Sequence, residues 1–270
     1  FSINTYELVM LAINKKNTNN SILKYSVLLL LIGLSLAHFT SIYAFEHKVF
    51  NQNLSHIISS YIFFVFFCLF FYSLVINNFK TIHLSFYLMA VALTLIESCI
   101  LFKKSGFVPE QLIEHTLKIM LPLIGVFVLS RGELTTKTLI VLKILIACTF
   151  LGHGIYALGL HYIPKNFISM TTTILRIDKT NAENFLFVVG ILDILAVIGI
   201  FFKGITQKLA FIYMIIWGLI TALARLVYGS VVSTDSMEFL YYFSNTIYRI
   251  PNGLIPLFLY NAISKGLIYK

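Results

Sequence analysis

The sequence predicts an all-α fold: a polytopic bundle of about eight transmembrane helices. Three observations point to it: charged residues make up only 11% of the chain, hydrophobic residues make up 59%, and the mean hydropathy is +0.89. Soluble domains are usually near one quarter charged. A chain this poor in charge cannot cover a surface that faces water, but it can cover one that faces lipid. At roughly 20 residues per span, 270 residues hold about eight helices with short loops.

Apolar runs long enough to cross a bilayer recur along the whole chain. In order, the predicted spans are 25–45, 55–77, 84–102, 113–130, 139–160, 184–202, 209–228 and 239–262. The fourth contains Pro122, which membrane helices tolerate when neighbouring groups satisfy the freed carbonyl. The polar linker 161–183 is the best boundary between two halves. The predicted organisation is therefore an N-terminal tail (1–20), helices 1–4 (21–135) and helices 5–8 (136–270).

The basic residues of the loops predict how the bundle is oriented. Loops on the side of the N-terminus carry ten Lys and Arg residues, and loops on the other side carry seven. Short loops rich in Lys and Arg stay in the cytoplasm. Both termini are therefore expected to be cytoplasmic.

Short internal similarities suggest a duplication. Residues 34–38 and 149–153 both end in histidine, and each is followed closely by the tripeptide Ile-Tyr-Ala. Residues 116–124 and 246–256 each place a basic residue ahead of a proline. Spans 1–4 are thus expected to correspond to spans 5–8 as two parallel four-helix repeats. The alternative is chance similarity between apolar helices.

Ionisable residues inside a span cost a few kcal/mol on insertion scales, so each is a candidate for function. The chain has eight of them: His38, Glu97, Lys118, Lys143, His153, Asp193, Arg225 and Arg249. Counted at about 1.5 Å per residue, all but Lys143 fall in the middle or outer half of the membrane. This pattern predicts a polar cavity that is open to the outside.

The first candidate site combines His153, Asp193, Arg225, Arg249 and Asn252. Asp193 is expected within ion-pair reach of Arg225 or Arg249. One carboxylate against two guanidiniums leaves positive charge that invites an anion. The alternative is that Asp193 neutralises one arginine and only holds helices together. Asn252 belongs to segment 248–256, whose two prolines and one glycine predict a kinked or unwound helix.

The residues leave several chemical roles open for these groups. His153 lies between two glycines, and its imidazole could be a structural hydrogen-bonding group, a proton or quinone contact, or a haem ligand. Glu97 and Lys118 form a second candidate pair, interpreted as an ion pair or as part of a site. No metal site is predicted. No cofactor motif is evident, and a quinone is the cofactor that this pattern leaves open.

Residues 139–260 resemble the DoxX-like four-helix membrane proteins of bacteria. The shared features are Gly152-His153-Gly154, the run 164–170 that begins Pro-Lys-Asn-Phe, the run 190–194 ending Leu-Asp-Ile, and the run 217–225 from Trp to Arg. The resemblance implies a helical unit of the bacterial inner membrane linked to quinone-dependent sulfur oxidation or to redox-stress complexes. The extra N-terminal spans depart from this pattern, and the family provides no catalytic residue to transfer.

Three functions remain open from the sequence. The chain is either an accessory or scaffold subunit of a membrane complex, which is preferred, or a quinone-linked redox subunit, or a carrier for a small anion. No nucleotide-binding or hydrolase motif is present, so catalysis by this chain alone is the least supported. The expected partners are the lipid bilayer and other membrane-protein subunits. Nucleic acid is not expected, because the net charge of +9 is scattered. The quinone and carrier hypotheses require a pocket of at least about 300 Å³.

Overall fold

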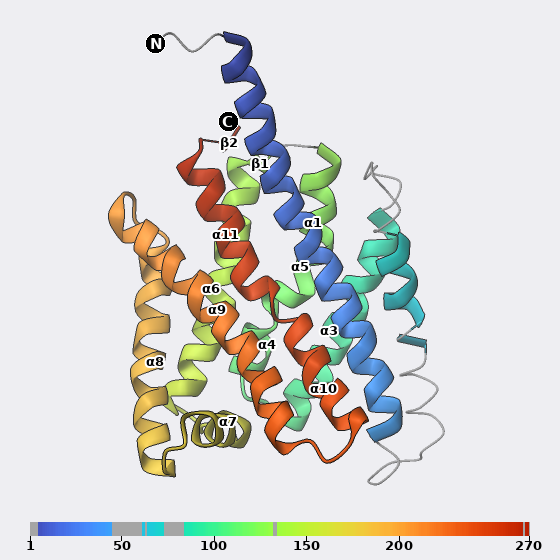
Figure 1. Cartoon of the computed structure of the whole chain (residues 1–270), viewed down its shortest axis with the longest axis vertical. Coiled ribbons are helices and arrows are strands. Elements are labelled where there is room, and N and C mark those ends of the chain that lie inside the picture. Colours follow the sequence, from blue (N-terminus) through green and yellow to red (C-terminus); the bar gives the residue numbers. More distant parts are fainter. Residues whose placement is uncertain are drawn as a thin grey trace.

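A computed structural model describes residues 5–44, 61–62, 64–72, 84–131, 134–266 and 268–269 (Figure 1). Its helices are α1 Thr5–Ala44, α3 Leu84–Lys104, α4 Glu110–Glu114, α5 Thr116–Arg131, α6 Thr136–Leu158, α7 Lys165–Leu175, α8 Lys179–Gly199, α9 Ile205–Val232, α10 Ser236–Ile247 and α11 Pro251–Ser264. Two short strands, β1 Leu134–Thr135 and β2 Ile268–Tyr269, pair in parallel. This pairing ties the turn between α5 and α6 to the C-terminal end of the chain.

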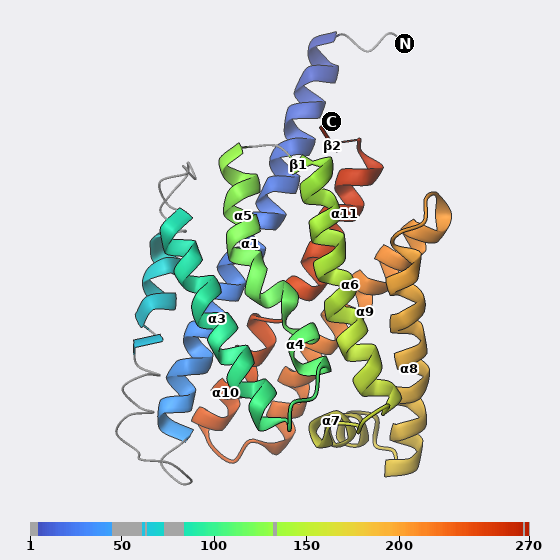
Figure 2. The same cartoon turned by 180° about the vertical axis from the view of Figure 1, so that it is seen from behind.

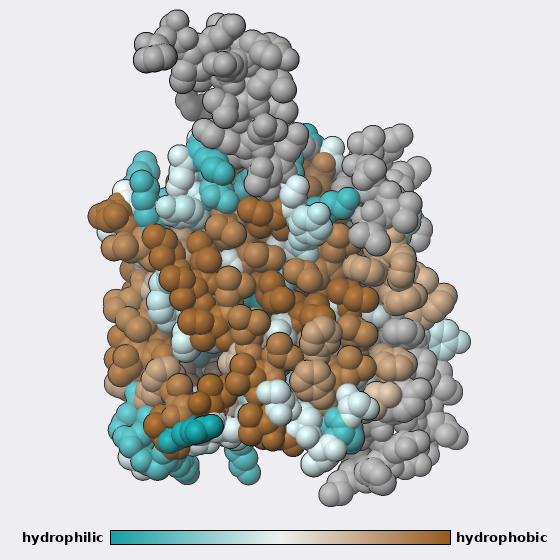
Figure 3. Space-filling model, in the orientation of Figure 1, coloured by the Kyte–Doolittle hydropathy of each residue, from teal (hydrophilic) through white to brown (hydrophobic). Residues whose placement is uncertain are grey.

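Five helical stretches of the described chain are long and apolar enough to cross a membrane. They are Asn19–Thr40, Glu110–Arg131, Thr136–Leu158, Lys179–Gly199 and Ile205–Val232. On the face shown in Figure 3, apolar side chains form a broad band across the middle of the molecule, and polar side chains gather toward its two ends. The all-helical architecture agrees with the sequence, and the band is what an integral membrane protein needs in order to face lipid.

The predicted number of eight spans remains a prediction. The second predicted span, 55–77, lies largely outside the described residues, and its described parts, 61–62 and 64–72, are helical. The third coincides with α3, whereas the eighth is shared by α10 and α11, which have 12 and 14 residues and are each too short to span alone. Residues 5–20 of the predicted tail continue α1 as one 40-residue helix.

The two ends of the bundle carry different connections. The start of α1 and strand β2 lie at one end, and α7 lies across the opposite end (Figures 1 and 2). At this second end α8 begins with an N-cap, in which the Asp178 carboxylate accepts the backbone N–H of Asn181 at 2.9 Å. This hydrogen bond to the charged form lowers the pKa of Asp178.

Two of the predicted spans are interrupted, the fourth near its start and the eighth near its middle. The break between α4 and α5 is at His115, and the break between α10 and α11 covers residues 248–250. Pro251 lacks a backbone N–H and starts a new helix, which explains the second break. The interruption predicted for segment 248–256 is thus confirmed, although Pro256 lies inside α11. Pro122 similarly lies inside α5.

Each break packs closely against a glycine of a long helix. A Cβ atom at Gly33 of α1 would lie 2.5 Å from the backbone nitrogen of Tyr248, and one at Gly152 of α6 would lie 2.6 Å from that of Glu114. Only a residue without a side chain allows these approaches. Accordingly, α1 packs on α10 and α11, and α6 packs on α4 and α5. The first long helix of each half therefore packs on the broken helix of the other half.

The placement of the connections yields a topology prediction. Reporter fusions after Lys270 and within loop 161–183 should report opposite sides of the membrane, because these segments follow opposite ends of the bundle (Figure 1). The measurement uses two reporter enzymes, one active only in the cytoplasm and one active only outside it, each fused at both positions. Two fusions on the same side would contradict the arrangement.

The close packing at the α4–α5 break predicts a sensitive position. Gly152→Ala should lower the free energy of unfolding by about 1–3 kcal/mol, because the added methyl group meets backbone atoms that must shift. Unfolding in mixed detergent micelles measures the change. Val141→Leu is the matched control, since it adds one methylene on the exposed face of the same helix. Equal stabilities of both variants would show that the contact is not tight.

Candidate functional site

The two broken helices bring a group of polar side chains together, here called the breakpoint cluster: Glu114, His153, Asn245, Tyr248 and Arg249. Arg249 Nη2 lies 3.7 Å from Glu114 Oε1, and His153 Nε2 lies 3.9 Å from the same oxygen. Arg249 Nη1 donates to Asn245 Oδ1 at 3.1 Å and also to the Tyr248 hydroxyl. The Glu114 side chain is only 9% exposed and that of Arg249 is 16% exposed. The break in α4–α5 is therefore tied electrostatically to the break in α10–α11.

The second predicted pair is present beside this cluster. Lys118 Nζ lies 2.9 Å from Glu97 Oε2, and His38 Nε2 lies 4.0 Å from that oxygen. The Lys118 ammonium also lies 5.2 Å from the centre of the Tyr248 ring, within cation–π range. The pairing of Glu97 with Lys118 is confirmed, and it links α3 and α5 to the breakpoint cluster. Any role of this pair as a binding site stays a prediction.

The outer edge of α4 is held by further polar contacts. His161 Nδ1 lies 2.5 Å from Glu110 Oε1, and the Tyr156 hydroxyl donates to Gln111 Oε1 at 3.2 Å. Both contacts join α4 to α6 or to the turn that follows α6. The short helix α4 has five residues and could not persist alone, so these contacts help to hold Glu114 in place.

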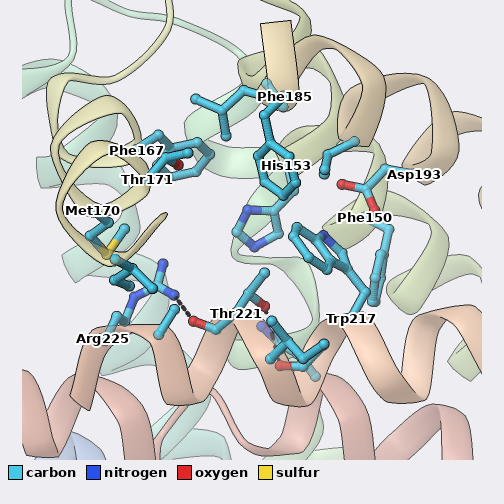
Figure 4. A pocket seen from close by; sticks show the side chains of 18 of the residues that line it. Phe150, His153, Phe167, Met170, Thr171, Phe185, Asp193, Trp217, Thr221 and Arg225 are labelled. Carbon is cyan, nitrogen blue, oxygen red and sulfur yellow. Dashed lines mark hydrogen bonds between the residues drawn. The ribbon is translucent and has the colours of Figure 1, made fainter. Parts of the chain in front are cut away.

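A separate cavity of about 160 Å³ lies among α6, α7, α8 and α9, with Asn252 of α11 on its wall. Its walls are largely apolar and include the rings of Phe150, Phe167, Phe185 and Trp217, and its polar side chains include His153, Asp193 and Arg225 (Figure 4). Four of the five residues predicted as a first site thus line one cavity. Arg249, the fifth, belongs to the breakpoint cluster instead. His153 is the residue that takes part in both.

The expected ion pair of Asp193 with an arginine is wrong. Asp193 Oδ1 accepts a hydrogen bond from the Tyr213 hydroxyl at 2.8 Å, and it makes no ion pair within the described chain. Helices α6 and α8 cross tightly at Gly154 and Gly190, which sets the position of Asp193 on the α8 side. Asp193 and Arg225 lie on opposite sides of the cavity (Figure 4). The cavity between them is the reason that they do not pair.

Arg225 carries a buried charge on which Glu114 acts only from beyond ion-pair distance. The residue is 7% exposed, and its Nη1 donates to the Thr221 carbonyl at 2.5 Å. The described residues provide no carboxylate within ion-pair distance of this guanidinium. A guanidinium has five N–H donors, so most of them lack a protein acceptor here. Because a buried charge without a close partner is costly, these donors are favourable positions for an acceptor such as water or an anion.

The cavity is small and open on one side. Its volume is about half of the 300 Å³ that the quinone and carrier hypotheses were expected to require, so the cavity does not meet that expectation. At about 30 Å³ per water molecule, it holds the equivalent of about five. Three lining residues border its mouth and are partly exposed: Leu175 at 45%, Phe185 at 38% and Ile220 at 48%. Only part of a larger ligand would therefore be enclosed.

Sequence reasoning missed two residues that organise the site. Glu114 lies at the edge of the predicted span 113–130, which made it look like a loop residue. Pro109 followed by Glu110 is a helix-start signal, and it could have shown that Glu114 belongs to a helix of its own. Tyr248 gave no such signal, because its contacts with Arg249 and Lys118 depend on how the two halves meet.

The fold and this site define the chain as an all-helical protein with five helices that could span a membrane and a small set of ionisable side chains buried in an apolar interior. Comparison of the chain with protein-family models, with curated proteins and with solved structures finds no match in any of the three. The DoxX-like resemblance therefore remains a prediction from short motifs, and no residue role is taken from it.

The breakpoint cluster predicts a large effect of removing one charge. Arg249→Gln should reduce the free energy of unfolding by about 3 kcal/mol, because it leaves the Glu114 carboxylate buried without its guanidinium partner. Mixed-micelle unfolding measures this loss, and the double variant Arg249→Gln with Glu114→Gln should recover part of it.

Lys179→Gln is the matched control for this experiment. It removes one basic charge from the exposed pair Lys179–Glu183, whose atoms lie 3.6 Å apart. Exposed pairs contribute about 0–1 kcal/mol, so little change is expected. A comparable loss of unfolding free energy in both variants would show that the buried Glu114–Arg249 pair stabilises the fold no more than the exposed Lys179–Glu183 pair does.

Proposed function

We propose that this protein is an integral membrane carrier for a small anion, with its binding site at the cavity among α6–α9. The observation that supports this best is the buried guanidinium of Arg225, which lines the cavity and has no carboxylate partner in the described chain. A positive charge in a low-dielectric interior is stabilised by an anionic ligand that accepts its free N–H groups.

The broken helices favour a carrier over a static scaffold. Many transporters place their sites beside interrupted helices and move one repeat against another. Here each break contacts a glycine on the first long helix of the opposite half, and the two breaks meet through Glu114 and Arg249. On this proposal, the chain is two parallel four-helix repeats, and the joint between them is the breakpoint cluster.

The accessory-subunit hypothesis explains less of the geometry. A scaffold would use its buried charges in pairs, as Glu97 does with Lys118 and Glu114 does with Arg249. It has no need for an uncompensated arginine at a cavity. Partner subunits remain compatible with a carrier, and so does the proposed location in a bacterial inner membrane with both termini in the cytoplasm. In that orientation the cavity belongs to the outer half of the membrane, because α7 lies at the end opposite β2 (Figure 1).

A quinone is the second candidate ligand, favoured by one observation. His153 and Arg225 are both donors that line an aromatic cavity, and the two carbonyl oxygens of a quinone could accept from them. The volume of about 160 Å³ would leave most of a substituted quinone outside. This candidate is tested by extracting the purified protein with organic solvent and measuring its quinone content. Absence of quinone would count against it.

The proposed carrier activity can be tested in proteoliposomes. Alkanesulfonates are suitable probes, because they remain monoanions at all accessible pH values and do not cross lipid in a protonated form. Counterflow of a radiolabelled short-chain alkanesulfonate should occur with the wild-type protein. Arg225→Gln should reduce the rate about tenfold or more, since a charged hydrogen-bond partner of the anion is lost.

Lys208→Gln is the matched control for the transport assay. It removes one basic charge from an exposed position near the opposite end of α9, so its rate should equal that of the wild type. Rates are normalised to folded, reconstituted protein. Equal transport by Arg225→Gln would exclude Arg225 as the anion site, and no counterflow with the wild type would contradict the carrier.

A further inference from the structure

We infer that the ligand of this cavity is a single-chain amphiphile with a carboxylate head, which enters sideways from the membrane between α8 and α9. The inference rests on the proposed anion site and specifies its substrate class. The head would bind Arg225 inside the cavity, and the apolar chain would leave through the mouth bordered by Leu175, Phe185 and Ile220.

The charges around the cavity select the head group. Arg225 is the guanidinium on its wall, and the Asp193 carboxyl lies on the opposite side (Figure 4). A dianionic head such as a phosphate monoester would be held by one positive charge while it faces a carboxyl group. A monoanion matches the single guanidinium, and a planar carboxylate accepts two parallel N–H groups from it. The remaining polar groups, His153 and Asn252, can donate to the same head.

The size and walls of the cavity select the rest of the ligand. The enclosed volume holds a carboxylate and a few carbons, so a longer molecule must extend beyond it. The side chains around the mouth are apolar and exposed. An apolar chain that leaves the cavity there meets lipid rather than water. A small soluble anion would gain nothing from these walls.

Helix α7 forms the end wall of this entrance. Phe167, Met170, Thr171, Ile174 and Leu175 all line the cavity from α7, and their spacing places them on one face. The basic residues Lys165, Arg176 and Lys179 at its two ends are exposed. This is the arrangement of a helix that lies in a membrane interface, with its apolar side toward the acyl chains. An amphiphile in the membrane would then meet α7 with its head group and the apolar mouth with its chain.

The sequence provides a direct reporter for this site. Trp217 is the single tryptophan of the chain, and it lines the cavity (Figure 4). Its fluorescence, excited where tyrosine does not absorb, therefore reports on the surroundings of the cavity without labelling. Bromine quenches tryptophan at short range, so palmitate with a bromine atom beside the carboxylate should quench Trp217 saturably when the full chain is held in phosphatidylcholine nanodiscs.

The experiment compares four probes and three variants. The probes are bromopalmitate, its uncharged methyl ester, a bromoalkyl phosphate of the same length, and the short soluble acid bromopropionate. Bromopalmitate should saturate the quenching at the lowest concentration. Arg225→Gln should weaken its binding by about tenfold or more, and Ala224→Leu, which fills the cavity, should weaken it without removing the charge. Lys208→Gln should bind as the wild type does. Melting temperatures in the nanodisc confirm that each variant is folded.

Each outcome decides one step of the inference. Equal quenching by the ester would overturn the anionic head, and tighter binding of the phosphate would overturn the carboxylate. Equal binding of bromopropionate would overturn the amphiphile and its entry from lipid, while the proposed anion carrier would stand. Absence of saturable quenching by all four probes would remove the site and the proposed function together. If Arg225→Gln does not fold, Ala224→Leu and the ester still decide the result.

Discussion

The structure depends on compensation of charge and backbone polarity where two helices are interrupted inside an apolar bundle. At each break, backbone groups lose helical partners, and unsatisfied groups in lipid cost several kcal/mol each. The backbone groups find partners close by: the Leu117 N–H donates to Thr149 Oγ1 at 3.3 Å, and the N–H groups of Tyr248 and Arg249 donate to the carbonyls of Ser244 and Thr246. The charged side chains of the two breaks compensate each other through the Glu114–Arg249 pair. The breaks can persist because they meet each other. Neither half could maintain its break alone without leaving a buried charge unpaired.

This constraint explains why small residues lie where they do. A broken helix has to approach a straight one closely if its polar atoms are to be excluded from lipid. Gly33 on α1 and Gly152 on α6 allow this approach, since a methyl group at either position would overlap backbone atoms of the opposite half. His153 follows Gly152 directly. The close contact between Gly152 and the backbone of Glu114 therefore also brings the His153 imidazole near the Glu114 carboxylate. Packing and electrostatics are therefore set by adjacent residues.

The two interior arginines have opposite environments, and this difference separates stability from function. Arg249 is engaged by a carboxylate, an amide and a phenol, so its charge is used within the fold. Arg225 donates to one carbonyl of its own helix and faces an aromatic cavity. Arg249 therefore contributes to folding through its partners, whereas Arg225 has no carboxylate within ion-pair distance in the described chain and is the residue proposed to bind a ligand. The proposed anion carrier and its amphiphilic substrate both follow from this asymmetry.

The sequence by itself determined the class of the fold, because composition and the length of apolar runs are enough to identify helices that face lipid. It also identified the charged residues of the interior, since each is costly there, and the interruption ahead of Pro251, since proline removes a donor. Only the tertiary structure decided the partners: Asp193 bonds to Tyr213 instead of an arginine, and Arg249 pairs with Glu114. Such partnerships depend on the rotation and depth of helices that pack at glycines, and an apolar pattern leaves both undetermined. The cavity, which keeps Arg225 apart from Asp193, depends in the same way on how α6, α7, α8 and α9 pack together.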